Sequence, residues 1–324
     1  RLMKTVIIDN SLCTLPIAEG TSPELICRYI HALAETGVKY VELDFRTVMK
    51  MQELPDCVEY IFRLGDPMFA QLTQAFDFRY VVVTMHDIKD EIDVGNTPVI
   101  LEIPRFEGFN RKLQALAQKF VSGPISMIRV RSSFDFMNIE QAKELVWRSK
   151  SAFTVPIDVC PMDAKRTALD TALKVSNAGV DSMTLCMGKS KSYASLEDFL
   201  FTMTMVFNSM PKEYSIPALC KAEAYHRIIF GLKSADRITE IMEHVDYDIS
   251  HLTNTDTGDR VKMHVSLKDR MMLRRSYVSA LQRFAEEEDI PEDIAQEIFD
   301  AIDHFDMSLY DQIFVKDEKN KILN

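Results

Sequence analysis

Acidic, basic and sulfur-bearing side chains stand at or just after the ends of short β-branched runs in the first two thirds of the chain. They are Cys13, Glu42, Asp44, Arg63, His86, Arg131, Ser133, Asp158, Cys160 and Lys189. The carboxyl ends of parallel strands meet at one face of a sheet, and enzymes built on such sheets place their chemistry there. The sequence therefore predicts that these side chains gather around one site.

Two pairs of these residues have a spacing that fixes their relative orientation. Arg131 precedes Ser133 by two positions, and Asp158 precedes Cys160 by two, so each pair points to one side of its strand. If Arg131 and Asp158 face the same interior, they either form a buried ion pair or leave the guanidinium to hold a ligand carboxylate. Arg131, Ser133 and Asp158 are thus candidate substrate-binding residues, with both alternatives open.

Sulfur atoms from Cys13, Cys160 and Met162 are expected at the same place. Thiolate and thioether ligands suit zinc or Cu(I), but Cys and Met also fill apolar space, and the second interpretation is favoured. The sequence places no histidine beside either cysteine to activate a thiol nucleophile. His86 follows a predicted strand and is the best-sited histidine, which makes it a further candidate substrate ligand.

The elements that position these residues alternate regularly. The predicted strands are Thr5–Asp9, Tyr40–Asp44, Glu59–Arg63, Tyr80–Thr84, Pro98–Ile103, Ser126–Arg131, Thr154–Cys160 and Ser182–Cys186. Helical patterns separate them, which indicates a parallel sheet, closed or doubly wound. Two helices, Ser22–Glu35 and Ala164–Ala178, each end at a Gly-Val pair that leads into a strand. This repetition is typical of one βα unit repeated around a barrel.

Composition limits the classes of partner. The 324 residues are 47% hydrophobic and 27% charged, with a formal net charge of −11. This charge argues against nucleic-acid and anionic-membrane partners, and no apolar run approaches the length of a membrane span. The six cysteines lack the spacing of a disulfide framework, and we expect a cytoplasmic protein with reduced thiols.

The alternation of strands and helices stops after Pro211, and residues 209–324 are expected to form a helical C-terminal region. The predicted helices are 218–245, 267–288 and 292–305. The last of them carries Ile294, Ile298, Ile302 and Phe305 at helical spacing. An apolar face of this kind needs a partner, and either the preceding domain or a second copy in a homodimer would supply it.

Three segments resemble the family of isopropylmalate synthase, homocitrate synthase and hydroxymethylglutaryl-CoA lyase. Ile8–Thr14 resembles the family's opening D-T-T-L-R-D motif, and Val41-Glu42 resembles the I-E segment that follows it. Pro156–Leu173 aligns without a gap with the family's P-I-x-F-H-x-H-N-D segment, and Ala194–Glu197 resembles its N-A-P-L-E. The resemblance covers about residues 4–205 and implies a (β/α)8, or TIM, barrel over residues 1–208.

Members of this family are divalent-metal barrels that make or break carbon–carbon bonds beside a 2-oxo acid or an acyl-CoA. The resemblance makes Glu42 and Arg63, which the family also carries, candidate catalytic residues. The family's arginine–aspartate pair, two metal histidines and loop asparagine fall on Cys13, Thr14, Cys160, Met162 and Tyr193. Neutral hydroxyls, thiols and thioethers are poor ligands for a hard cation, and a thiol cannot replace a guanidinium. We therefore expect no Mg²⁺ or Mn²⁺ and no other cofactor.

Two functions are compatible with this pattern. The first is an aldol-type acyltransferase or lyase that acts on a small 2-oxo acid or acyl-CoA without the usual metal, using Glu42, Arg63 and Arg131. The second is a catalytically inactive relative that binds a small carboxylate or acyl-CoA metabolite, or acts as a regulatory or structural subunit.

Overall fold

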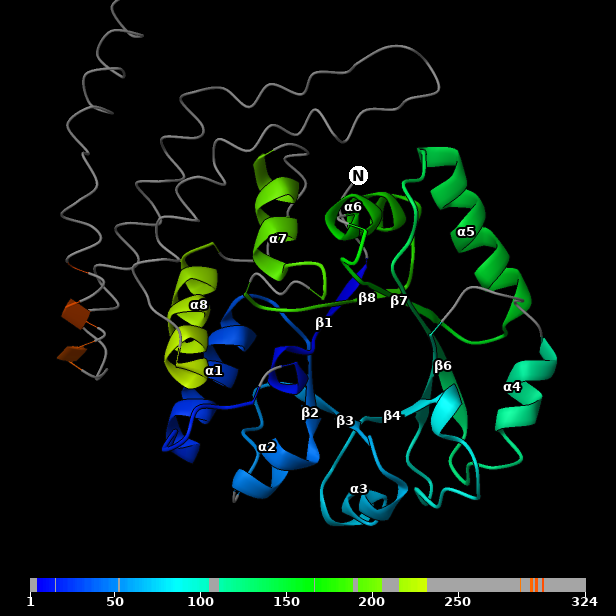
Figure 1. Cartoon of the computed structure of the whole chain (residues 1–324), viewed down its shortest axis with the longest axis horizontal. Coiled ribbons are helices and arrows are strands. Elements are labelled where there is room, and N and C mark those ends of the chain that lie inside the picture. Colours follow the sequence, from blue (N-terminus) through cyan, green and yellow to red (C-terminus); the bar gives the residue numbers. More distant parts are fainter. Residues whose placement is uncertain are drawn as a thin grey trace, which may run out of the picture.

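Eight parallel strands close into a barrel in the order of the sequence. The computed structural model describes residues 5–14, 16–51, 53–104, 111–165, 167–188, 192–205 and 216–231, with six single residues between 286 and 299. The strands are β1 (Val6–Asp9), β2 (Tyr40–Asp44), β3 (Glu59–Arg63), β4 (Tyr80–Thr84), β5 (Val99–Ile103), β6 (Ile125–Ser132), β7 (Ile157–Pro161) and β8 (Ser182–Leu185). Figure 1 shows them as a ring seen almost end-on. The predicted closed barrel is confirmed.

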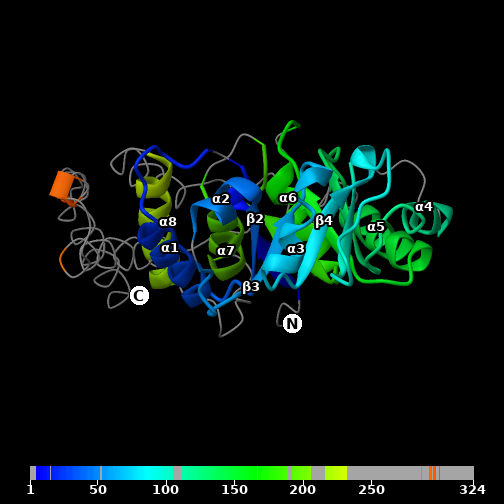
Figure 2. The ribbon, with the colours of Figure 1, turned by 90° about the horizontal axis from the view of Figure 1, so that it is seen from below.

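Helices surround this ring. They are α1 (Pro23–Glu35), α2 (Phe45–Lys50), α3 (Leu72–Ala75), α4 (Arg111–Ala117), α5 (Ile139–Ala152), α6 (Ala168–Asn177), α7 (Leu196–Met205) and α8 (Ile216–Phe230). Three short 3₁₀ helices, η1 (Ser11–Cys13), η2 (Pro67–Phe69) and η3 (Met85–Asp87), follow β1, β3 and β4. In both views α8 lies beside α1 (Figures 1 and 2). The Ala18 amide before α1 donates to the Ile229 carbonyl of α8 over 2.8 Å.

Local signals set most element boundaries. Strands β2, β3 and β4 have the predicted bounds, and α1 begins at Pro23 because the Ser22 hydroxyl accepts a hydrogen bond from the Leu25 amide at 3.2 Å. Helix α6 begins at Ala168, later than the predicted Ala164. The Asp163 carboxylate instead accepts a hydrogen bond from the amide of Ala168, the first residue of α6, at 3.0 Å.

The barrel interior has two layers of different chemistry. Side chains alternate between the inside and the outside of each strand. The layer nearer the amino ends is apolar and consists of Ile8, Tyr40, Ile61, Val82, Ile100 and Met127. Above it, toward the carboxyl ends, the inward positions carry charge. The larger apolar cluster lies between the strands and the surrounding helices, so the fold's main core is outside the ring.

Of the predicted helical C-terminal region, the structure describes little beyond residues 216–231. Helix α8 confirms a helix at the start of the predicted 218–245 segment, whereas the predicted helices 267–288 and 292–305 lie outside the described residues apart from single positions. The domain boundary at 208 and the homodimer stay predictions. In the described part of the chain, no helix is long and apolar enough to cross a bilayer.

The repeated Gly-Val junctions have the backbone that the sequence predicts. Gly37 has φ 94° and Gly179 has φ 87°, a left-handed conformation that costs an L-residue about 1–2 kcal/mol. No atom lies within 4 Å of a Cβ built on Gly179, so backbone strain is the sole cost of a small side chain there.

We expect Gly179→Ala to lower the free energy of unfolding by about 1–2 kcal/mol. Asparagine tolerates the left-handed region better than alanine, so Gly179→Asn should cost less. Urea unfolding of both variants measures the difference, and an equal loss in the two would contradict a conformational cause.

Candidate functional site

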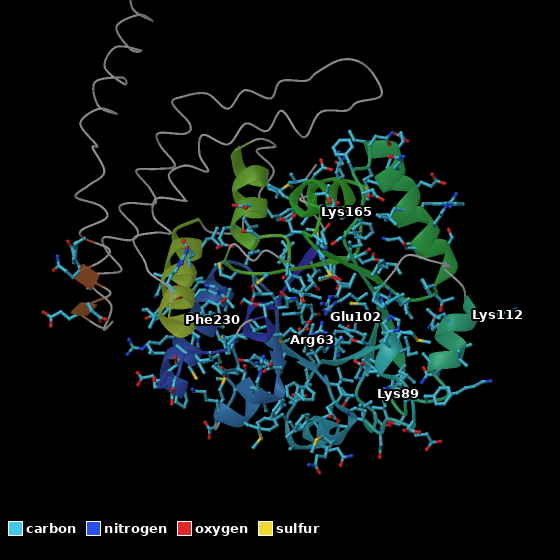
Figure 3. All side chains as sticks on the ribbon, viewed as in Figure 1. Arg63, Lys89, Glu102, Lys112, Lys165 and Phe230 are labelled. Carbon is cyan, nitrogen blue, oxygen red and sulfur yellow. The ribbon has the colours of Figure 1, made fainter. Side chains whose placement is uncertain are left out.

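Six charged side chains meet in the upper layer of the barrel interior, and we call them the lumen network. They are Glu42 of β2, Arg63 of β3, Glu102 of β5, Arg129 and Arg131 of β6, and Asp158 of β7. Figure 3 shows the labelled Arg63 and Glu102 near the middle of the ring, whereas Lys89 and Lys112 lie at its edge. Three guanidiniums and three carboxylates give the network a balanced formal charge.

Glu102 is the acceptor that all three arginines share. Arg63 donates through Nη1 and Nη2 to the two carboxylate oxygens, at 3.2 and 2.7 Å. Arg131 Nη1 donates to Oε1 at 3.2 Å, and Arg129 Nη1 lies 3.5 Å from Oε2. Burial by itself raises the pKa of Glu102, but the three guanidiniums outweigh burial and hold this pKa well below its ordinary value. Glu102 is therefore ionised although it is fully buried.

Arg129 links the remaining carboxylates. Its Nε donates to Asp158 Oδ2 at 2.5 Å and its Nη1 to Glu42 Oε2 at 2.7 Å. Glu42 also accepts from Arg63 Nε at 2.6 Å. Burial opposes ionisation of Glu42, but Arg129 and Arg63 lower its pKa overall. Arg129 is the largest fully buried side chain in the described part of the chain, and it stays charged because two carboxylates flank it.

Hydroxyl groups complete the lower edge of the network. Asp158 accepts hydrogen bonds from Ser182 Oγ at 2.9 Å and from Thr184 Oγ1 at 2.7 Å. Thr84 Oγ1 donates to Glu102 at 3.3 Å. Ser182 reaches Asp158 Oδ1, which no arginine contacts among the described residues, and the two threonines add donors to oxygens that arginines also contact, which helps to offset the burial of these charges.

Of the two alternatives for Arg131 and Asp158, the direct ion pair is not formed. Arg129 lies directly opposite Asp158 in the β6–β7 register and takes that carboxylate, whereas Arg131 pairs with Glu102. Glu102 and Arg129 were missed by the sequence reasoning. The signals for them were an acid within the apolar run of β5 and the Arg-Val-Arg alternation of β6, which places both arginines on one face.

Two guanidinium donors of the network have no hydrogen-bond partner among the described residues. They are Arg129 Nη2 and Arg131 Nε, and both atoms are buried. Arg131 is also the least enclosed member of the network, with 28% of its side chain exposed. Its guanidinium carbon lies 5.5 Å from the centre of the Tyr193 ring, within the range of a cation–π contact.

The other predicted site residues lie around the network. Ser133 Oγ accepts a hydrogen bond from the Ala164 amide at 3.2 Å, so it joins β6 to the loop after β7. Asp44 caps α2, where its Oδ1 accepts from the Thr47 amide at 3.1 Å. His86 is exposed in η3. Lys189 lies outside the described residues.

Cys13 and Thr14, at the family's arginine–aspartate positions, make local contacts. Thr14 Oγ1 donates to the Ser11 carbonyl at 2.8 Å, and Cys13 Sγ donates to the Glu42 carbonyl at 3.3 Å. Burial raises the pKa of the Cys13 thiol well above its ordinary value, and Glu42 adds to the effect. The thiol is therefore neutral at physiological pH, and a neutral thiol is not the nucleophilic form.

Cys160, Met162 and Tyr193, at the family's other metal positions, form the upper edge of the same region. Cys160 is fully buried, and burial raises its pKa. Met162 and Tyr193 are joined as an antiparallel bridge between the end of β7 and the loop after β8. Burial also raises the pKa of Tyr193, to about 12, so its phenol is neutral.

These donors do not fit the divalent ion of the family. A hydroxyl engaged with a carbonyl, neutral thiols, a thioether and a phenol offer none of the anionic oxygens that a hard cation prefers. Among the residues that the structure describes, no group of three His, Cys, Asp or Glu is arranged to hold a metal ion, zinc included. That the protein binds no metal stays a prediction.

A second buried polar cluster lies outside the ring, between β1 and the helices. Ile8 points into the barrel, so Asp9 points outward, where it is fully buried. It accepts hydrogen bonds from the Ser11 amide, at 3.1 Å, and from the Ser11 hydroxyl. That hydroxyl lies 2.6 Å from Tyr29 Oη. Burial, aided by the charge of Glu197, raises the pKa of Asp9 to about 7.

The chain was compared with known proteins. No family model matches it, and no curated protein matches it. Among solved structures, the hydroxymethylglutaryl-CoA lyase of Bacillus subtilis is 13% identical, with a TM-score of 0.52 over 71% of this chain and 95% of that one. The hydroxymethylglutaryl-CoA lyase of Acinetobacter baumannii is 13% identical, with a TM-score of 0.51 over 70% of this chain and 92% of that one.

The barrel has the fold of the hydroxymethylglutaryl-CoA lyases. The carboxyl transferase domain of Rhizobium etli pyruvate carboxylase is also similar, at 12% identity and a TM-score of 0.51 over 90% of this chain and 64% of that one. The resemblance read from the motifs is therefore confirmed at the level of fold. Identities this low show the fold alone, and function has to be argued from the site.

Removing the shared acceptor tests the lumen network. Glu102→Gln leaves three guanidiniums around a neutral amide, and breaking a buried ion network by removing one partner costs about 3–5 kcal/mol of unfolding free energy. Glu140→Gln is the matched control, because Glu140 is exposed and its ion pair among the described residues is with Lys143, at 2.7 Å. Chemical denaturation measures both, and a similarly small loss in the two variants would show that the network does not hold the barrel together.

Asp9 should make stability depend on pH. Because its pKa is raised in the folded chain, the Asp9 carboxyl stays protonated there at pH values at which it is already ionised in the unfolded chain. Its stabilising contribution is therefore complete below about pH 4 and lost as pH rises toward about 7. The free energy of unfolding of the wild type minus that of Asp9→Asn should fall by roughly 3 kcal/mol from pH 4 to pH 7.5. A difference that stays constant over this range, in urea titrations at each pH, would show that Asp9 ionises normally.

Proposed function

We propose that this chain is a metabolite-binding member of the lyase-type barrels that does not carry out their metal-dependent carbon–carbon chemistry. The observation that carries the proposal is the lumen network. Glu42 and Arg63, the two candidate catalytic residues, are bound to each other and to further buried partners. A general acid, a base or an enolate-stabilising group has to reach the reacting atoms, and these side chains are committed elsewhere.

Electrostatics support the same conclusion. Glu42 is fully buried and its pKa is lowered, so it is a weak base. To meet a substrate it would have to leave two guanidiniums, and stranding a charge in a dry interior is unfavourable. The acyltransferase or lyase hypothesis therefore has less support from this geometry than the binding hypothesis.

A small carboxylate is the ligand class that the mouth of the barrel favours. Arg131 contributes one hydrogen bond to Glu102 and retains a buried donor without a described partner. Two neighbours of the same fold were crystallised with small carboxylates, 3-methylmalate together with coenzyme A in one and 3-hydroxypyruvate in the other. A guanidinium with a spare donor suits a carboxylate in this chain too.

The test combines metal analysis with ligand-induced stabilisation. The purified protein should contain no stoichiometric Mg²⁺, Mn²⁺ or Zn²⁺ and should cleave no 3-hydroxyacyl-CoA when these ions are added. A small 2-oxo acid such as pyruvate should raise the melting temperature, because a ligand that binds only the folded state stabilises it by mass action. Metal-dependent cleavage with turnover would contradict the proposal and restore the enzyme hypothesis.

Arg131→Ala separates ligand binding from folding. Because Arg131 makes one of several contacts to Glu102, its loss should cost about 1–2 kcal/mol of stability, less than Glu102→Gln. The response of the melting temperature to pyruvate should disappear. A loss of stability as large as that of Glu102→Gln, with pyruvate binding retained, would make Arg131 a structural residue.

A further inference from the structure

We infer that Arg129 Nη2 and Arg131 Nε form one anion site inside the barrel, and that this site takes a compact monocarboxylate and excludes acyl-CoA and dicarboxylates. The inference rests on the proposed function, since it specifies the ligand of the same region. It depends on three features: the two spare donors, the balance of charge around them, and the segment that covers them.

The spare donors belong to neighbouring guanidiniums. Arg129 and Arg131 stand two residues apart on one face of β6, and both approach Glu102, Arg129 with its Nη1 at 3.5 Å and Arg131 with its Nη1 at 3.2 Å. Their other nitrogens, Arg129 Nη2 and Arg131 Nε, are buried without a described partner. Buried N–H groups in native proteins are almost always paired with protein, ordered water or a ligand. Two oxygens on one carbon can accept from two such donors at once.

The balance of charge in the network limits the net charge of the ligand. The lumen network holds three guanidiniums and three carboxylates, but Glu102 is shared by all three arginines. Arg131 has no other carboxylate partner in the described part of the network, so its charge is the least compensated. The carboxylate of a bound ligand would give Arg131 an anionic partner that it does not share with the other arginines. A second negative charge on the same ligand would meet three buried carboxylates without a further cation among the described residues of the network, and a low-dielectric interior penalises it.

The cover of the site sets the size of the ligand. The Met162 amide donates to the Ser132 carbonyl at 2.8 Å, and the Ala194 amide donates to the Pro161 carbonyl at 3.0 Å. Between these bonds Met162 and Tyr193 form a bridge, and the Tyr193 ring lies 5.5 Å from the Arg131 guanidinium carbon. The ends of β6 and β7 and residues 193–194 are thus joined beside the Arg131 guanidinium. A long acyl chain attached to the carboxylate would have to pass through this cover.

Calorimetric titration of the full chain with a matched series of ligands tests the inference. Acetate and pyruvate are compact monocarboxylates, and hexanoate is a monocarboxylate with a long chain. Malonate is a dicarboxylate, acetyl-CoA is an acyl thioester, and chloride is a simple anion. Acetate and pyruvate should bind at least tenfold more tightly than the other four. Arg131→Gln should weaken acetate at least tenfold. Arg148→Gln, on the outer face of α5 where Arg148 pairs with Glu144, should change nothing.

A second variant tests the cover without touching the arginines. Tyr193→Ala should bring the affinity for hexanoate to within about threefold of that for acetate, while acetate itself still binds. Melting curves of each variant show that it is folded before binding is compared. If hexanoate remains excluded from folded Tyr193→Ala, the cover does not set the ligand size and that part of the inference fails.

The remaining outcomes distinguish the inference from the proposed function. If acetyl-CoA or malonate binds as tightly as acetate in an Arg131-dependent manner, the proposed function stands and the selectivity inferred here is wrong. If chloride binds as tightly as acetate, the site does not select carboxylates and the inference is again overturned. If no carboxylate of any size binds, ordered water satisfies the two donors, and both the inference and the ligand of the proposed function fall.

Discussion

One buried carboxylate, Glu102, constrains the interior of this barrel because three guanidiniums depend on it. Removing charges from water is costly, and the cost is offset only when every charge has a partner and the remaining lone pairs are bonded. The strands satisfy this condition in large part by presenting Glu42, Arg63, Arg129 and Asp158 within ion-pair distance of one another. Apart from the donors Arg129 Nη2 and Arg131 Nε, which have no described partner, the charges above the apolar layer are engaged with each other, and this leaves little freedom for acid–base chemistry.

The residues at the mouth are consistent with such an interior. The three carboxylates of the network are already paired with three guanidiniums, so a divalent cation at the mouth would need other ligands to supply negative charge. The positions available instead carry Thr14, Cys160, Met162 and Tyr193, all neutral at physiological pH. The mouth therefore offers neutral donors and the most exposed guanidinium of the network, that of Arg131, in place of anionic oxygens.

Much of the fold could be predicted from the sequence, because alternation and capping are local signals. The eight strands, the Ser22 cap and the glycines after α1 and α6 all follow from residues close in sequence. The pairing within the site could not be predicted in the same way. Arg129 and Arg131 face the same side of β6, and only the stagger of β6 against β7 decides that Asp158 meets Arg129. Glu102 was overlooked because a single acid in an apolar run gives no local sign that three arginines surround it.

Asp9 shows the effect of burial on a carboxylate that is paired with no arginine among the described residues. Both Asp9 and Glu102 are fully buried, and burial raises the pKa of each. For Glu102 the guanidiniums reverse the effect, so its carboxylate is charged. Asp9, one position along β1 from an inward residue, faces Ser11 and the charge of Glu197 instead, so its pKa stays raised. The two faces of the barrel wall therefore differ in protonation at these positions: arginines keep Glu102 charged on the inner face, whereas burial raises the pKa of Asp9 on the outer face.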